Sequence, residues 1–260
     1  GEYRQIRRVF DELGPFDYVY NCAAEFGRWN GEDYYENLWK TNAIGTKNIL
    51  RLQEKYDFKL IHFSSSEVYG DYPNIMIESV MDDYEIKQLN DYAMSKWVNE
   101  MQIRNSILQY KTESVVVRIF NTYGPGEFYS PYRSVNCRFL YCALMGLKWT
   151  VFKGHSRTST FLQDTVNTLC NIVENFKSGE TYNIGGSDLH TIEELSEIIL
   201  EVTGADPSLV KYKNSEILTT KTKVVDISKS KKDLNHSNTV SLEDGIKITA
   251  DWMRSAYGLK

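Results

Sequence analysis

The sequence of 260 residues has little of what several common protein classes require. Its four cysteines form no CxxC pair and its four histidines are scattered, so we expect structural thiols in a reducing compartment and no metal site. No apolar run approaches the roughly 18–20 residues of a membrane-spanning helix. The net charge of −5, without a basic cluster, argues against nucleic acid as a partner. We therefore expect partners that are neither nucleic acid nor membrane.

What is present is an ordinary globular composition. Hydrophobic residues make up 42% of the chain and charged residues 25%, which excludes disordered and low-complexity classes. The chain is long enough to bury a real core in one or two domains. Its first ten residues are charged and amphipathic, unlike a secretory signal peptide, so we expect a cytoplasmic protein.

Apolar strands alternate with helices along the chain. In the first half, helices are expected at residues 3–13, 34–55 and 90–110, and strands at 16–22, 58–63 and 114–120. In the second half, helices are expected at 135–145, 160–176, 191–202 and 242–257, and strands at 150–153, 181–185 and 223–227. Because the first three strands are apolar throughout, the pattern predicts a parallel sheet covered on both faces. Gly204 and Ser241 mark a helix end and a helix start.

Two segments carry residue types suited to proton transfer. Ser64, Ser65 and Ser66 directly follow a strand, at the edge where open α/β sheets bind ligands, although a serine cluster alone is also an ordinary turn. Tyr92 and Lys96 share one helix face. A free tyrosine has a pKa of about 10, and a neighbouring ammonium lowers it, so we expect Lys96 to lower the pKa of Tyr92. A YxxxK pair alone is common on solvated helices, and its value here comes from following the serine cluster.

A third segment places Asn121 before a Gly-Pro turn, after the third strand. Together with segments 21–24, 41–48, 182–186 and 239–245, and with Arg157 ahead of Asp164, these motifs resemble the extended short-chain dehydrogenases/reductases. Within that family, the chain is similar to the NAD-dependent epimerase/dehydratase group that acts on nucleotide sugars. The resemblance runs from about residue 3 to residue 258.

The resemblance implies a fold, a cofactor and partners. The fold is α/β, a doubly wound Rossmann-type parallel sheet with a smaller C-terminal α/β substrate lobe. Residues 1–124 and 160–187 would form the cofactor and catalytic domain, and residues 125–159 and 188–260 the substrate lobe. The cofactor would be NAD, with NADP as the alternative, and the substrate a nucleotide-diphosphate sugar. The family also implies a homodimer that pairs through helices at about 35–55 and 91–110.

The resemblance also implies roles for individual residues. The catalytic set is Ser65, Ser66, Glu67, Tyr92 and Lys96; the cofactor would be bound by Ala23, Ala24, Asn42 and Ser64 with Tyr92 and Lys96; the substrate would be bound by Asn121, Arg133 and Arg157. Tyr92, as the phenolate, would take the proton of the sugar 4-hydroxyl beside Ser65 while a hydride leaves C4. An arginine suits the pyrophosphate because its planar fork binds bidentately.

Glu67 indicates which branch of the family the chain resembles. Ser66-Glu67 resembles the decarboxylases and 4,6-dehydratases, and a dehydratase needs a carboxyl group as an acid or base. The alternatives are a 4-epimerase, in which Glu67 only orients a loop, and a non-catalytic or truncated sugar-nucleotide-binding protein. Two departures leave the sugar open: segment 221–226 has lysine where decarboxylases usually carry arginine, and Ser159 replaces an aromatic residue.

The chain contains no G-x-x-G-x-x-G turn, the family's phosphate-binding fingerprint. Its first expected strand matches the family's fourth, so two βα units of around 30 residues each are missing. The strand at 16–22 would then form an apolar edge of the sheet with no neighbouring strand. We therefore expect the native protein to be longer, by about 50–60 residues on the same arithmetic.

Overall fold

The computed structural model describes residues 2–214, 217 and 219–259, which pack as two compact units. The first unit comprises Gly1–Asp71, Glu78–Ile119 and Ile172–Asn183, and the second comprises Tyr72–Ile77, Phe120–Asn171 and Ile184–Lys260. These units are defined by packing. The division into a cofactor domain and a substrate lobe is one of function and stays a prediction.

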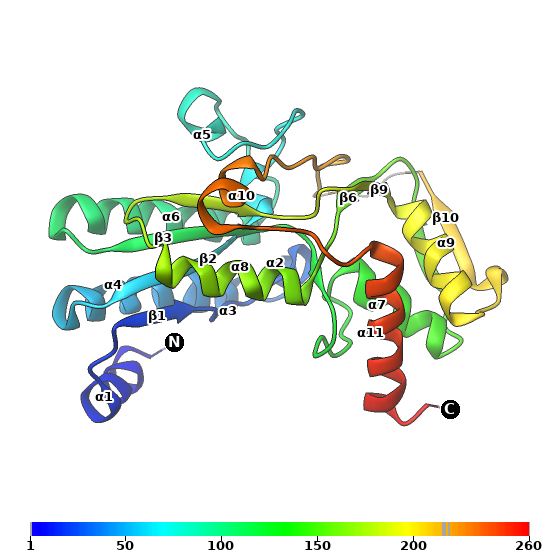
Figure 1. Cartoon of the computed structure of the whole chain (residues 1–260), viewed down its shortest axis with the longest axis horizontal. Helices are drawn as coiled ribbons and strands as arrows, with labels where there is room; N and C mark the ends of the chain where they lie inside the picture. The colour runs from blue at the N-terminus through cyan, green and yellow to red at the C-terminus, as the bar shows by residue number, and fades with distance from the viewer. Residues whose placement is uncertain (1, 215–216, 218, 260) are drawn as a thin grey trace. The chain divides into compact units, whose positions relative to one another are not determined.

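A four-stranded sheet with the order β1-β2-β3-β8 organises the first unit. Its strands are β1 (Tyr18–Asn21), β2 (Lys59–Ser65), β3 (Ser114–Ile119) and β8 (Thr181–Ile184). The pairs β1–β2 and β2–β3 are parallel, and Figure 1 shows these strands side by side. The predicted Rossmann-type α/β fold is therefore confirmed, because parallel neighbours joined by helices are its defining feature. Among the described residues, no strand pairs with the outer edge of β1.

Helices connect these strands. They are α1 (Tyr3–Leu13), α2 (Arg28–Asp33), α3 (Tyr35–Trp39), α4 (Gly45–Tyr56), α5 (Val80–Asp83) and α6 (Asp91–Tyr110). The single helix predicted at 34–55 is wrong in one respect: a π-helical turn at Lys40–Ile44 separates α3 from α4. Such a turn widens the helix locally, and the spacing of apolar residues carries no signal for it.

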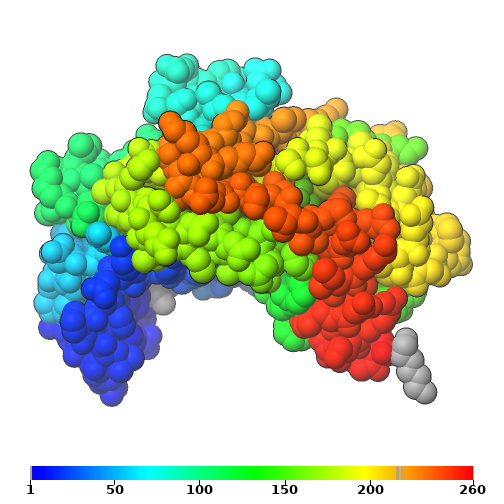
Figure 2. Space-filling model, in the orientation of Figure 1, coloured from blue at the N-terminus to red at the C-terminus, as the bar shows by residue number. Residues whose placement is uncertain are grey.

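Aromatic and aliphatic side chains form the core beneath α1 and α4. The ring of Phe10 lies 5.2 Å from that of Phe16 and 5.1 Å from that of Phe58. Leu50 and Leu52 of α4 are fully buried in the same cluster. Figure 2 shows α1, in dark blue, against the lighter blue of α4. Burial of about 1.5–3 kcal/mol for each large apolar side chain holds these helices on the sheet.

The second unit consists of short strands and longer helices. Its strands are β4 (Thr122–Tyr123), β5 (Trp149–Phe152), β6 (Ser156–Thr158), β7 (Thr160–Phe161), β9 (Leu189–Thr191) and β10 (Val210–Lys213). Its helices are α7 (Val135–Leu144), α8 (Leu162–Glu174), whose last residues belong to the first unit, α9 (Ile192–Thr203), α10 (Ser228–Leu234) and α11 (Leu242–Tyr257). A core that includes Leu140, Trp149, Leu195 and Met253 joins α7, α9 and α11.

Most predicted helix boundaries in this unit are confirmed. Ser241 accepts a hydrogen bond from the Asp244 amide at the start of α11, and Gly204 ends α9 with a φ of +67°. The predicted helix at 160–176 starts only at residue 162, because β7 pairs with β4. The strand predicted at 223–227 is wrong: Val225 makes only an isolated bridge to Met76. In the described part of the chain, no helix has both the length and the apolarity to cross a bilayer.

Candidate active site

The carboxyl end of β2 carries the serine cluster. Ser64 and Ser65 are the last residues of this strand, and Ser66 begins the short 3₁₀ helix Ser66–Tyr69. The Ser65 hydroxyl accepts a hydrogen bond from the Glu67 amide at 3.2 Å and so caps this helix. The cap fixes Glu67 directly beside the end of the strand.

The start of α6 is tied to the same place. Asn90 caps α6 by accepting from the Ala93 amide at 2.8 Å, and its amide nitrogen donates to Glu67 Oε2 at 3.4 Å. Tyr92, in the first turn, makes a hydrogen bond with Ser65 and lies within electrostatic reach of Glu67. The structure therefore brings together Ser65, Glu67 and Tyr92, as the sequence predicted.

The protonation of Tyr92 differs from expectation. Burial raises the pKa of Tyr92 to about 12; the Ser65 hydrogen bond lowers it and the Glu67 charge raises it further. The expected lowering by Lys96 is wrong here, because the Lys96 ammonium lies 5.9 Å from the ring centroid and donates instead to the Phe63 carbonyl at 2.7 Å. Tyr92 is therefore a neutral phenol at pH 7.

Lys96 is buried, and its ammonium group loses its proton more readily than that of an exposed lysine. Burial lowers the pKa of Lys96 to about 8, against the opposing effects of Cys22 and Glu100. Sequence reasoning assigned Cys22 only as a structural thiol and missed Glu100. The signal for Glu100 was available, since it follows Lys96 by four residues on one helix face.

Glu100 belongs to a buried polar cluster that the sequence did not predict. Arg118 of β3 and Glu100 are 0% and 1% exposed, and they form a salt bridge of 2.8 Å. The Ser64 hydroxyl donates to the same carboxylate at 2.5 Å.

The residues expected at the cofactor differ in exposure. Ala23 is exposed and Ala24 is half-buried in the loop that follows β1. Asn42, in the π-helical turn, is 0% exposed and accepts from the Glu25 amide at 2.8 Å. Its amide nitrogen donates to the Glu25 carbonyl at 3.0 Å and to Ser95 Oγ at 2.9 Å. Asn42 therefore anchors the loop after β1, and its direct contact with a cofactor stays a prediction.

The residues expected at the substrate all lie in the second unit. Asn121 has a φ of +31° between β3 and β4. Arg133 is half-buried in the loop before α7. Arg157 of β6 is 9% exposed and donates to the Lys221 carbonyl at 2.8 Å and to Thr219 Oγ1 at 3.0 Å. Its guanidinium thus fastens segment 219–221, and pyrophosphate binding by these residues stays a prediction.

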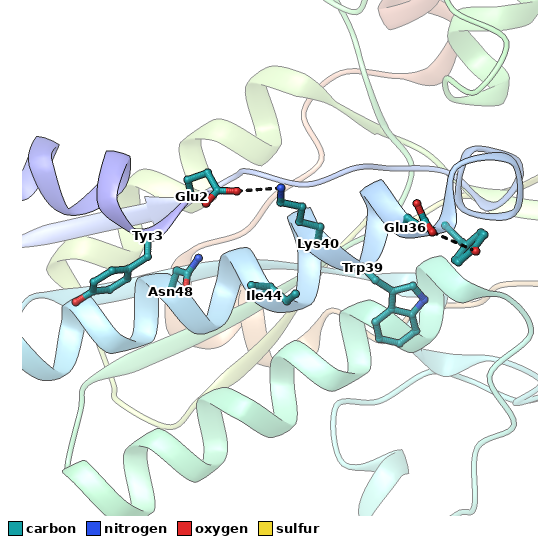
Figure 3. A pocket seen from close by; sticks show the side chains of 8 residues that line it. Glu2, Tyr3, Glu36, Trp39, Lys40, Ile44 and Asn48 are labelled. Carbon is teal, nitrogen blue, oxygen red and sulfur yellow. Dashed lines mark hydrogen bonds and ion pairs between the residues drawn. The ribbon is translucent and has the colours of Figure 1, made fainter.

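The first unit also has a surface cavity of about 680 Å³ on α3 and α4 (Figure 3). It is lined by Glu2, Tyr3, Tyr35, Glu36, Trp39, Lys40, Ile44 and Asn48. Lys40 and Glu2 form an ion pair of 2.9 Å across it. None of the predicted site residues lines this cavity; the predicted catalytic residues lie instead at the end of β2 and at the start of α6.

Comparison with known proteins decides the family. Residues 2–185 match the model of the NAD-dependent epimerase/dehydratase family. The chain belongs to this family. A UDP-N-acetyl-alpha-D-glucosaminuronate decarboxylase of Bacillus cytotoxicus is 30% identical, over 93% of this chain and 78% of its own length. UDP-glucuronic acid decarboxylase 6 of Arabidopsis thaliana is 32% identical, over 99% of this chain and 72% of its own length.

A solved structure has the same fold over almost the whole chain. The UDP-glucose 4-epimerase of Thermotoga maritima, crystallised with UDP-glucose, superposes with a TM-score of 0.88 at 26% identity. The match covers 98% of this chain and 82% of that one.

The residues present fit one end of the family's cofactor. A buried ammonium and a phenol on one helix face, at the carboxyl ends of parallel strands, suit a nicotinamide ribose with its hydroxyl groups. These are Lys96 and Tyr92. The 260 residues contain no glycine-rich turn for the pyrophosphate, so the fit is confined to the nicotinamide end.

Proposed function

We propose that the protein, with NAD, oxidises a nucleoside-diphosphate sugar at C4 and that the resulting ketone loses CO₂ or water. The observation that carries this proposal is the meeting of Ser65, Glu67 and Tyr92 at the end of β2, beside Lys96. The decarboxylases at 30% and 32% identity support the same chemistry.

Each residue has a role in moving protons. Ser65 binds the sugar 4-hydroxyl. Tyr92, a neutral phenol in the free protein, first releases its own proton to solvent; the phenolate then takes the proton of the 4-hydroxyl and gives a proton back when the hydride is returned. Bound NAD would accept the hydride from C4 and give it back. Lys96 holds the nicotinamide ribose and stabilises the phenolate as Tyr92 loses its proton.

Glu67 separates the branches of the reaction. Its carboxylate lies within electrostatic reach of Tyr92 and accepts a hydrogen bond from Asn90, which supports a place for it beside the reacting sugar ring. In dehydration, Glu67 would act as the acid or base at C5 and C6. In decarboxylation, the 4-ketone itself makes the C5 carboxylate leave as CO₂, and Glu67 holds the ring.

A substrate panel tests the proposal. The full-length protein is incubated with UDP-, dTDP- and GDP-sugars, including hexuronates, with NAD or NADP, and products are weighed by mass spectrometry. Loss of the mass of CO₂ or of water is the expected result. Unchanged substrates together with no calorimetric binding of either cofactor would favour the non-catalytic alternative and overturn the proposal.

A 4-epimerase is the second candidate. The lysine-bearing segment 221–226 favours it, because lysine lacks the fork with which arginine grips a substrate carboxylate. An epimerase would give a product of unchanged mass with inverted C4, and Glu67→Gln would leave its turnover nearly intact. In a dehydratase, the same substitution should lower kcat about 100- to 10,000-fold.

We also propose a cytoplasmic homodimer that pairs through α3–α4 and α6. Met94, Met101 and Leu108 are exposed at intervals of seven residues along α6, and Ile44 is exposed at the end of the π-helical turn. Such an apolar stripe fits helix-to-helix pairing between two copies. Light scattering of the purified protein should give twice the chain mass, and Leu108→Lys should shift it to the monomer.

A further inference from the structure

Three residues one helical turn apart on α6 lie against the end of β2. Lys96 donates to the Phe63 carbonyl at 2.7 Å, and Glu100 accepts from the Ser64 hydroxyl at 2.5 Å. Tyr92, one turn earlier, makes a hydrogen bond with Ser65. Three turns of the helix thus contact three neighbouring residues of the strand, although the contacts do not follow the order of the strand. The contacts at Lys96 and Glu100 set where Ser65 lies relative to Tyr92.

Arg118 holds the carboxylate of Glu100 in place. Its Nε donates to Glu100 Oε1 at 3.1 Å and its terminal nitrogen to Oε2 at 2.8 Å, in a bidentate pair. A third nitrogen donates to Tyr69 Oη at 2.9 Å and to the Glu78 carbonyl at 3.0 Å. Both carboxylate oxygens of Glu100 are therefore bonded, and the carboxylate has one fixed orientation.

Stability alone gives a poor reason for this arrangement. Removing two charges from water costs much of what their attraction returns, so a buried ion pair often contributes no more than apolar side chains of the same volume. A buried pair does specify one geometry, because any other leaves a charge without a partner. Here the specified geometry is the register of β2 on α6, at the proposed active site.

We propose that Glu100, held by Arg118, is a positioning residue for the reaction: it fixes Ser64 and thereby the place of Ser65 beside Tyr92. This inference rests on the proposed function. Glu100 acts through Ser64 and Lys96 and need not touch the sugar or the cofactor.

The charge of Lys96 depends on groups from three elements. Glu100 on its own helix and Cys22, after β1, raise its pKa, while burial lowers it to about 8. His62 of β2 also lies within electrostatic reach and is held neutral by burial, which keeps its pKa well below the usual value. Because Glu100 raises the pKa of Lys96 and is held in place by Arg118, removal of Glu100 should lower the pKa of Lys96 further.

Two variants separate the two effects of Glu100. Ser64→Ala removes the contact with the strand and keeps the buried ion pair. The double variant Glu100→Gln/Arg118→Met removes both charges together, so that no lone charge is left buried. Asp82→Asn is the matched control, because it removes an exposed carboxylate that pairs with Arg104 of α6 at 3.9 Å.

The readouts are kcat, KM, the pH profile and the pKa of Lys96, measured from the ¹³Cε shift in the full-length protein. Ser64→Ala should lower kcat about ten-fold or more, as expected for a disturbed catalytic geometry, with KM and the pKa of Lys96 unchanged. The double variant should lower kcat and also the pKa of Lys96. Asp82→Asn should change neither quantity.

A purely structural role predicts a different result. The variants would then unfold at lower temperature while kcat and the pKa of Lys96 stayed at wild-type values, and the inference would be wrong. The NMR titration does not need turnover. A wild-type protein without activity but with the expected Lys96 shift in the double variant would therefore refute the proposed function and retain the electrostatic part of the inference.

Discussion

Replacing Asn42 by alanine distinguishes an anchoring residue from a cofactor contact. The side chain is fully buried and makes three hydrogen bonds, two to the backbone of Glu25 and one to Ser95. Ser95 in turn donates to the Tyr92 carbonyl at 2.8 Å. The substitution therefore disconnects the loop after β1 from the first turn of α6.

The cost can be worked from these bonds. Each buried hydrogen bond contributes roughly 0.5–1.5 kcal/mol, so the loss of three predicts that Asn42→Ala lowers the free energy of unfolding by about 2–4 kcal/mol. For a chain of this size, roughly 2–4 °C per kcal/mol converts the loss into a fall in Tm of about 5–15 °C. This is a large part of the roughly 5–15 kcal/mol of a typical domain.

Urea unfolding followed by circular dichroism measures the effect without cofactor. The control is Asn74→Ala in an exposed loop, where a surface change costs within about 0.5 kcal/mol. If Asn42→Ala left the unfolding curve at the wild-type midpoint and only weakened NAD binding, Asn42 would be a cofactor contact and the anchoring argument would fail.

Three further predictions concern single residues. Tyr92→Phe keeps the packing and removes the hydroxyl, so steady-state turnover should fall about 100- to 10,000-fold; a smaller fall would mean that another group moves the proton. His62 is 1% exposed, and burial keeps its pKa well below 6.5, so that below pH 6.5 the unfolded chain binds more protons than the folded chain. The free energy of unfolding should therefore fall by about 1.4 kcal/mol for each pH unit below 6.5, and His62→Gln should remove this dependence in urea titrations. Gly245→Ala would place a Cβ 2.1 Å from Tyr123 Oη and should cost about 1–3 kcal/mol in the same assay, whereas an unchanged midpoint would show that Tyr123 moves aside freely.

The sequence predicts the parallel sheet because its strands are short apolar runs that end in distinctive polar residues. The run ending at Ser65 forms β2, and the helix with Tyr92 and Lys96 starts within one residue of its predicted position. A strand that ends in hydroxyl groups, followed by a capped helix, restricts the polar side chains to one edge of the sheet. The meeting of Ser65 and Tyr92 therefore follows from local pattern and topology.

Long-range polar pairing is what the sequence could not predict. Nothing in the local spacing joins Arg118 to Glu100, or Asn42 to Glu25, because each pair is brought together only by strand order and helix packing. The π-helical turn that aims Asn42 inward has no periodic signal either. The expectation that Lys96 lowers the pKa of Tyr92 was wrong for the same reason, because Lys96 donates instead to the Phe63 carbonyl of β2.

The protonation states of Tyr92 and Lys96 lead to a specific pH profile. With a pKa of about 12 for Tyr92 and about 8 for Lys96, the free protein at pH 7 has a neutral phenol and a cationic lysine. The reacting complex needs Tyr92 as a phenolate and Lys96 as a cation. We therefore expect kcat/KM to rise ten-fold per pH unit up to about pH 8, because the phenolic proton is released to solvent, and to level off above about pH 8, because Lys96 then loses the charge that stabilises the phenolate. If the charge of Lys96 did not matter, kcat/KM would instead keep rising ten-fold per pH unit through pH 8 toward 12. Since the two profiles diverge above pH 8, one series of kcat/KM measurements between pH 7 and 10 shows whether the reaction needs the cationic form of Lys96.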